Sequence, residues 1–264
     1  MIEHLPAIPG FTTAPHTHLG ETREVYRRGF GPAVIVMSEI PGITPQVARF
    51  ATTVADAGFS VWMPQLFGTP MKPISTGYLA TSLARICIGR EFSLLAAHQS
   101  SPIVDWLRAL AREAHEACGG AGVGAIGMCL TGNFGLAMML DAPVIAPVLS
   151  QPSLPAAIPG KRDALHASPA EIAAARDKID HAGARILGLR FNGDFMCPAG
   201  RFKTLQREFG DAFEGLSLDP RHANPEGFGP PHSVLTTHLI DEAGQPTRAA
   251  LDRTLAFLRE QLVP

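Results

Sequence analysis

The chain has 264 residues and nearly balanced charge, with 22 Lys and Arg against 24 Asp and Glu and a formal net charge of −2. This balance provides no global field to hold nucleic acid or an anionic membrane surface, so the expected partners are small molecules or protein surfaces. Residues 1–20 lack a basic stretch followed by an apolar one, and no later run could span a bilayer, so we expect a cytoplasmic location. The four cysteines show no C-x-x-C pairing and are expected to be free thiols.

Short apolar runs alternate with helical patterns along the chain. The runs rich in valine and isoleucine predict strands at 33–37, 58–63, 123–128, 144–149, 185–191 and 215–218. Helices are predicted at 45–57, 78–97, 102–117, 168–181 and from 246 to the end of the chain. This alternation predicts one α/β domain over residues 1–264, with a mostly parallel central sheet flanked by helices. Ligands of such sheets bind beyond the carboxyl ends of the strands.

A cysteine follows the third of these predicted strands, in the segment GMCLTG at 127–132. A nucleophile between small residues, after a strand and before a helical run, is typical of a nucleophile elbow. The N-terminus of the helix favours a thiolate at Cys129, and its free N–H groups can hold an oxyanion. The pattern departs at Thr131, where the motif has glycine, so the turn has to accommodate a β-branched side chain. The alternative is that Cys129 merely packs under an ordinary strand-to-helix turn.

An acid and a base follow Cys129 in the order that this kind of site uses. Asp194 lies just past the strand predicted at 185–191, although a loop aspartate after glycine is equally often a turn former. His232 lies in a loop rich in glycine and proline, which can present an imidazole without burying loop backbone. His222, in another loop, and His238, in a possible edge strand, are its competitors. We predict His232 as the base.

The histidines near the N-terminus could suggest a metal site. His4, His16 and His18 have no Glu or Cys companion at the spacing of a zinc site. We therefore expect a polar N-terminal segment, no metal and no cofactor.

Four ordered motifs resemble the dienelactone hydrolase family, and the match extends from about residue 33 to residue 232. The motifs are the segment SEIPGI at 38–43, the elbow at 127–132, the segment GDFMCP at 193–198 and the segment PHS at 231–233. The resemblance implies an α/β-hydrolase fold and a Cys–His–Asp triad. It also implies that the backbone N–H groups of Leu130 and Ile40 hold the oxyanion.

The resemblance further assigns a role to Glu39, which from the residues alone would be a surface carboxylate. In the family, the resting thiol is largely protonated, and substrate binding moves this glutamate into position to help form the thiolate. Two arginines in the family hold a substrate carboxylate. Arg90 resembles the first, with Arg85 on the same helix as its rival, and Thr236 stands in place of the second. We therefore expect carboxylated dienelactones to be poor substrates.

These observations predict a hydrolase that cleaves carboxylic ester or lactone bonds of a small molecule, as a monomer or a small homo-oligomer. Two alternatives come from other classes: a non-catalytic protein that keeps the hydrolase pocket for ligand binding, and a redox-sensing thiol at Cys129. The complete ordered set of nucleophile, acid and base argues against the binding protein, which has no reason to keep all three.

Overall fold

A computed structural model describes residues 6–88 and 97–263. Its centre is a sheet of eight strands in the order β1-β2-β4-β3-β5-β6-β7-β8, in which β1, β2 and β4 pair antiparallel and the other neighbours pair parallel. The strands are β1 (Thr12–His18), β2 (Glu21–Arg28), β3 (Ala33–Met37), β4 (Ser60–Pro64), β5 (Val123–Met128), β6 (Val144–Ser150), β7 (Ile186–Phe191) and β8 (Phe213–Leu218). The predicted mostly parallel sheet is confirmed, and all six predicted strands are present within two residues at each end.

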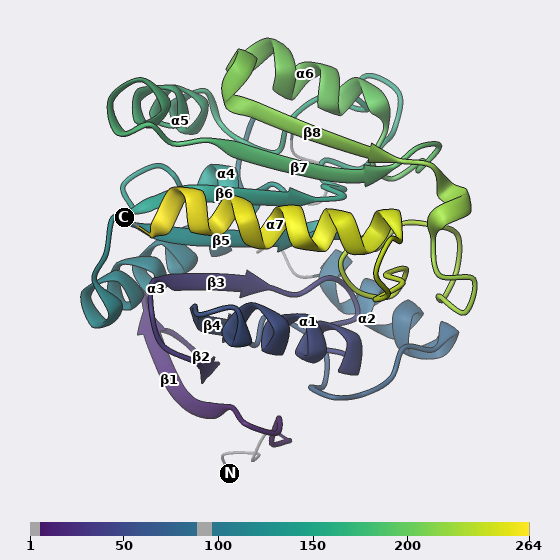
Figure 1. The fold of residues 1–264 in the computed structure, drawn as a ribbon, viewed down its shortest axis with the longest axis horizontal. Helices are drawn as coiled ribbons and strands as arrows, with labels where there is room; N and C mark the ends of the chain where they lie inside the picture. The colour runs from purple at the N-terminus through teal and green to yellow at the C-terminus, as the bar shows by residue number, and fades with distance from the viewer. Residues whose placement is uncertain (1–5, 89–96, 264) are drawn as a thin grey trace.

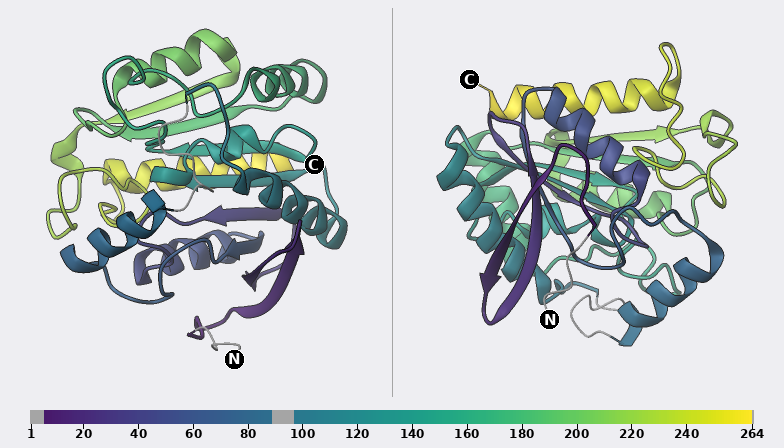
Figure 2. Two further views of the ribbon diagram at one scale, coloured as in Figure 1. Left: turned by 180° about the vertical axis from the view of Figure 1, so that it is seen from behind. Right: turned by 90° about the horizontal axis from the view of Figure 1, so that it is seen from below.

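Helices cover both faces of this sheet. They are α1 (Pro45–Asp56), α2 (Thr76–Ile88), α3 (Ile103–Cys118), α4 (Phe134–Ala137), α5 (Pro169–Ala182), α6 (Ala199–Phe209) and α7 (Pro246–Leu262). Figure 1 shows α1 and α7 on the near face, and Figure 2 shows the other helices from behind. A hydrophobic core lies on each face of the sheet, and alternate residues of β3 belong to different cores. Val34 and Val36 pack on the side of α1 and α7, and Ile35 and Met37 pack on the side of α3.

The ends of two predicted helices follow their capping residues. Thr44 accepts a hydrogen bond from the N–H of Val47 before α1, and the reciprocal capping box of Ser168 and Glu171 begins α5. Gly183 ends α5 in the left-handed conformation. The helix predicted at 78–97 is present as α2 up to residue 88. Residues 89–96 lie outside the described residues, and Ala97 lies in a bend. Among the described residues, no helix has the length and apolar character needed to cross a membrane.

The N-terminal segment is mostly polar, but the sequence did not predict that β1 and β2 form a hairpin that extends the sheet. Val25 and Tyr26 are fully buried, and the ring of His16 on β1 bonds to Glu113 on α3. Arg27 on β2 donates to the same carboxylate at 2.7 Å. The hairpin escaped prediction because most of its residues are polar, so its strands lack a clear apolar alternation. The edge strand considered before His238 is also absent, since residues 234–238 form turns.

The carboxyl ends of the parallel strands meet at one edge of the sheet, on the right in Figure 1. The loop after β3, the turn after β5, the loops after β6 and β7 and the long segment before α7 all converge there. Each residue predicted for the site and described in the structure belongs to one of these loops, to the turn or to α2.

Candidate active site

Cys129 lies at a strained turn between β5 and the short helix α4. Its φ angle is +54°, a conformation that costs an L-residue free energy and persists only where the surroundings impose it. Close backbone approaches on both sides impose it here. A Cβ atom on Gly127 would lie 2.1 Å from the carbonyl oxygen of Thr131, and one on Gly132 would lie 2.4 Å from the Cα of Pro152. The geometry is that of a nucleophile elbow, with a shorter helix after it than the sequence pattern predicts.

The departure from the elbow motif at Thr131 has a structural reason. Its fully buried hydroxyl accepts the N–H of Met128 at 2.9 Å and lies 3.1 Å from the carbonyl oxygen of Met37, to which it can donate. Thr131 therefore ties the elbow to the end of β3. The glycine one place later leaves room for the chain at Pro152, so the turn accommodates the β-branched side chain.

The structure brings His232 and Asp194 together. The Nδ1 atom of His232 lies 2.6 Å from Oδ2 of Asp194, and both side chains are buried. The other oxygen of Asp194 accepts the N–H of Met196 at 2.9 Å, which fixes the carboxylate. Among the described residues, the buried Nε2 atom of His232 has no hydrogen-bond partner. An imidazole oriented on one side and open on the other can move a proton.

Cys129 raises the pKa of His232. Burial lowers the pKa of His232, but the interactions of the ring with Cys129 and the hydrogen bond to Asp194 outweigh burial and raise this pKa to about 10. Cys129 and His232 therefore interact electrostatically across the site.

The competing histidines make other contacts, although His238 also lines a cavity with Cys129. His238 accepts the backbone N–H of Ser233 at 3.2 Å through Nδ1, and its Nε2 lies 3.3 Å from the carbonyl oxygen of Gly229. Burial lowers the pKa of His238, which favours the neutral form that these two bonds require. His238 supports the backbone of the loop that carries His232. His222 ends a short 3-10 turn after β8 and does not line the cavity around Cys129.

Glu39 is buried, so the surface position that its residue type suggested is wrong. One carboxylate oxygen accepts the hydroxyl of Ser233 at 2.5 Å and the amide of Gln151 at 3.2 Å, and the other accepts the hydroxyl of Thr236. Within the described residues, no hydrogen bond joins Glu39 to Cys129. Sequence reasoning missed Gln151 and Ser233 as partners of Glu39. The fully buried Gln151 has a φ angle of +35°, a strain that no single sequence signals.

Cys129, His232 and Glu39 line one cavity of about 320 Å³. Its other walls are mostly aliphatic: Ile40, Ile74, Leu79, Leu83, Leu130, Leu154, Ala156 and Met196. Leu130 and Ile40, the predicted oxyanion donors, therefore lie beside the thiol, and in the described part of the chain the N–H of Ile40 has no hydrogen-bond partner. Arg85 is exposed on α2 and does not line the cavity. Arg90 lies outside the described residues.

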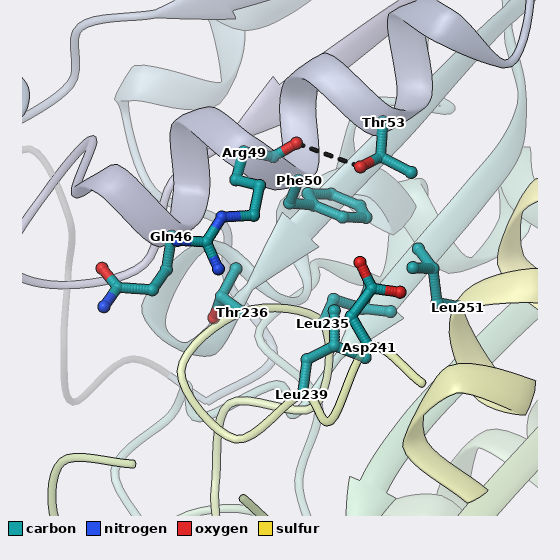
Figure 3. Close-up of a pocket in the computed structure, with 9 residues that line it drawn as sticks. All are labelled: Gln46, Arg49, Phe50, Thr53, Leu235, Thr236, Leu239, Asp241 and Leu251. Atoms are coloured by element: carbon teal, nitrogen blue, oxygen red, sulfur yellow. Dashed lines mark hydrogen bonds between the residues drawn. The ribbon is translucent and has the colours of Figure 1, made fainter. Parts of the chain in front are cut away.

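Thr236 does not line this cavity. Its side chain lies between Glu39 and the residues of α1, beside a cavity of about 30 Å³ that Gln46, Arg49 and Leu239 also line (Figure 3). A space of this size holds about one water molecule. The loop after His232 therefore turns position 236 toward Glu39 rather than into the cleft.

Two further described cysteines, Cys118 and Cys197, do not line the cavity around Cys129. Cys197 is fully buried, and burial, together with the charge of Asp194, raises its pKa to about 12, so it stays a protonated thiol. Cys118, at the end of α3, is half-buried, as is Cys129, and all three are free.

Within residues 6–88 and 97–263, no three His, Cys, Asp or Glu side chains form a group that could hold a metal ion. His4 lies outside the described residues.

A mostly parallel sheet whose strand-to-helix elbow carries a strained cysteine, followed by a bonded aspartate and histidine, has the architecture of the α/β-hydrolases. The sequence profile of the dienelactone hydrolase family matches residues 22–209, so the chain belongs to that family. Comparison with curated protein sequences gave no significant match.

Solved structures show the same fold at low sequence identity. A Klebsiella pneumoniae protein described as a candidate dienelactone hydrolase is 18% identical, with a TM-score of 0.63 over 95% of this chain and 99% of that one. A dienelactone hydrolase-like promiscuous phosphotriesterase from metagenomic libraries is 16% identical, with a TM-score of 0.60 over 96% and 98%. The dienelactone hydrolase of Anabaena variabilis is 15% identical, with a TM-score of 0.56 over 97% and 100%.

Proposed function

We propose that this protein hydrolyses carboxylic ester or lactone bonds through Cys129, His232 and Asp194. The observation that carries the proposal is the orientation of the buried His232. Asp194 holds its Nδ1 atom at 2.6 Å, while its Nε2 atom has no partner among the described residues and the ring shares a cavity with Cys129. Membership of the dienelactone hydrolase family supports a hydrolase.

The proposed reaction is acyl transfer in two steps. The Cys129 thiolate attacks the carbonyl carbon, and the N–H groups of Leu130 and Ile40 hold the resulting oxyanion. The His232 imidazolium then gives its Nε2 proton to the departing oxygen as the carbon–oxygen bond breaks, which leaves a thioester on Cys129. In the second step Nε2 accepts a proton from water, the water oxygen attacks the thioester, and the acid leaves with the thiolate restored.

Glu39 has a proposed part in forming the thiolate. In the resting arrangement its carboxylate is occupied by Ser233, Gln151 and Thr236, so it has to exchange these partners before it can act on the thiol. None of the three partners carries a charge. The carboxylate is therefore held by neutral donors, and its release does not require a charged substrate group to replace an ion pair.

The substrate that we propose is a small neutral ester or lactone. Aliphatic walls surround Cys129, and no arginine or lysine among the described residues lines the cavity. The described walls therefore offer a substrate carboxylate no guanidinium or ammonium group to replace its lost hydration. Carboxylated dienelactones should accordingly be poor substrates.

The free cysteines agree with the cytoplasmic location that we propose, and we propose a monomer or a small homo-oligomer.

Hydrolysis of p-nitrophenyl esters by the wild type and by Cys129→Ala tests the function. Cys129→Ala should lower kcat/KM by more than about tenfold, or about 1.4 kcal/mol of transition-state stabilisation. The matched control is Cys118→Ala, which removes a half-buried thiol at the end of α3 and should leave turnover unchanged. Mass spectrometry of acid-quenched wild type should show the acyl group on Cys129. The nucleophile assignment is wrong if Cys129→Ala keeps more than about a tenth of the activity.

The same measurements separate the two alternatives. A binding protein would retain esters without turnover in both the wild type and Cys129→Ala. A redox-sensing thiol would react with hydrogen peroxide at Cys129 and form no thioester with an ester substrate.

A further inference from the structure

A second cavity adjoins the one that holds Cys129. It has a volume of about 220 Å³ and lies on the side of the Asp194 loop. Met196, Pro230 and His232 line both cavities, so the two spaces meet at the histidine that we propose as the base. Its remaining lining residues are Asn192, Gly193, Asp194, Phe195, Pro220 and Pro231.

The walls of this second cavity suit an apolar group. Phe195, Met196 and three prolines provide carbon surface, while Asp194 and Asn192 are already engaged, by His232 and by Arg190 at 3.2 Å. Phe195 directly follows the proposed acid, and its side chain is 63% exposed. An exposed aromatic side chain in a concave site next to reactive groups is typical of a ligand contact.

The chemistry of the reaction indicates which part of an ester this cavity would take. The departing oxygen has to accept its proton from Nε2 of His232, so the alcohol portion leaves on the side of the histidine. The acyl portion stays beside Cys129, Leu130 and Ile40, within the larger cavity. The cavity beyond His232 lies on the side where the alcohol leaves, so it is placed to take that portion.

We propose that the cavity around Phe195 is a subsite for the alcohol portion of the substrate and that it takes a neutral apolar or aromatic alcohol. This inference rests on the proposed ester hydrolysis. It narrows the substrate class to open-chain esters with apolar groups on both sides of the ester bond. The alcohol and acyl portions of a small lactone are joined in one ring, so such a lactone would fill only the larger cavity and leave Phe195 without a contact.

Two esters that differ only in the alcohol test the subsite. Phe195→Ala should lower kcat/KM for benzyl butanoate about tenfold, equivalent to about 1.4 kcal/mol, and leave methyl butanoate within about twofold. Methyl phenylacetate, whose ring is on the acyl side, should also stay within about twofold. The control is Phe30→Ala, which removes an 85% exposed phenylalanine between β2 and β3 and should change none of the three. Equal changes for all three esters, or no change for the benzyl ester, would overturn the proposal.

Binding to the inactive enzyme separates this inference from the proposed function. Calorimetry with Cys129→Ala should show tighter binding of benzyl butanoate than of methyl butanoate. The double variant Cys129→Ala, Phe195→Ala should lose that preference. If the preference behaves in this way while the wild type hydrolyses no ester, the subsite stands and the proposed function fails. If Cys129→Ala binds neither ester, or binds both equally, the subsite proposal is wrong.

Discussion

His232 and Arg201, two buried side chains near the cleft, differ in whether all of their nitrogen atoms are hydrogen-bonded. Arg201 on α6 is fully buried and donates all five of its N–H groups to backbone carbonyl oxygens at 2.5–3.2 Å. The acceptors are Pro152, Pro155, Arg162, Ala164 and Met196. His232 has one nitrogen bonded to Asp194, while the other, among the described residues, has no partner.

This difference distinguishes a supporting group, Arg201, from the group that we propose as reactive, His232. A buried polar group whose bonds are all made fixes its surroundings, whereas one left open keeps a free-energy cost that a substrate or a proton can relieve. Arg201 fixes segments that wall the cleft, since Leu154, Ala156 and Met196 lie beside its acceptors or are among them. Precise support beneath an unsatisfied reactive group is what a preorganised site requires.

The largest expected effect comes from misorienting the open nitrogen of His232. Asp194→Asn keeps the shape but can donate to Nδ1, which favours the wrong tautomer of the ring. Ester turnover should fall by about 10²- to 10⁴-fold, while the free energy of unfolding changes far less. Steady-state kinetics together with urea denaturation measure both. Near wild-type kcat/KM in the Asp194→Asn variant would show that His232 does not depend on this carboxylate.

The second effect concerns the charge on His232. Cys129→Ala removes the side chain that helps to raise the pKa of His232 to about 10, so this pKa should fall. A histidine pKa raised above its unfolded value of about 6.5 stabilises the fold fully below about pH 6.5, and this contribution disappears as pH rises through the folded pKa. In the variant this contribution should therefore be smaller, and its loss should be complete at a lower pH. NMR titration of the ring checks this, with Cys118→Ala as control, and an unchanged pKa would show that Cys129 does not raise the pKa of His232.

The third prediction removes the supporting group. Arg201→Met leaves five carbonyl oxygens without this donor, two of them in buried bonds, and the free energy of unfolding should fall by about 3–5 kcal/mol. Arg176→Met, which removes a half-exposed arginine paired with Glu208, should cost less than about 1 kcal/mol. Urea denaturation compares the two. If Arg201→Met does not fold, Arg201→Lys provides the measurement. A loss no larger than that of Arg176→Met would show that the buried guanidinium supports nothing.

The smallest expected effect tests whether Glu39 belongs with the supporting groups or with the reactive ones. Glu39→Gln keeps the shape and removes the charge, so it should slow acylation by about tenfold or more if the carboxylate helps to form the thiolate. The rate of the p-nitrophenol burst, measured across the neutral pH range, reports acylation. An unchanged rate would assign Glu39 only to anchoring Ser233 and Thr236 in the loop that carries His232.

Sequence patterns located the parts of the site that depend on local structure. Strands β3 to β7 were predicted because parallel strands buried on both faces are short apolar runs. Cys129 and Asp194 were proposed for the candidate site from their places after such strands, and His232 from its loop rich in glycine and proline. The hairpin was missed because its buried positions are few among polar ones. The partners of Glu39 could not be predicted, since its bonds to Gln151 and Ser233 join residues separated by 112 and 194 positions.

A search pattern that demands glycine two places after the nucleophile would pass over this chain. Thr131 meets the need of the turn in another way, since its hydroxyl satisfies the N–H of Met128 and reaches the strand beside it. Glycine is still required where other backbone atoms approach, at Gly127 and Gly132. An elbow defined by the distances it has to accommodate, rather than by residue types at fixed positions, would include proteins in which the glycine has shifted by one residue.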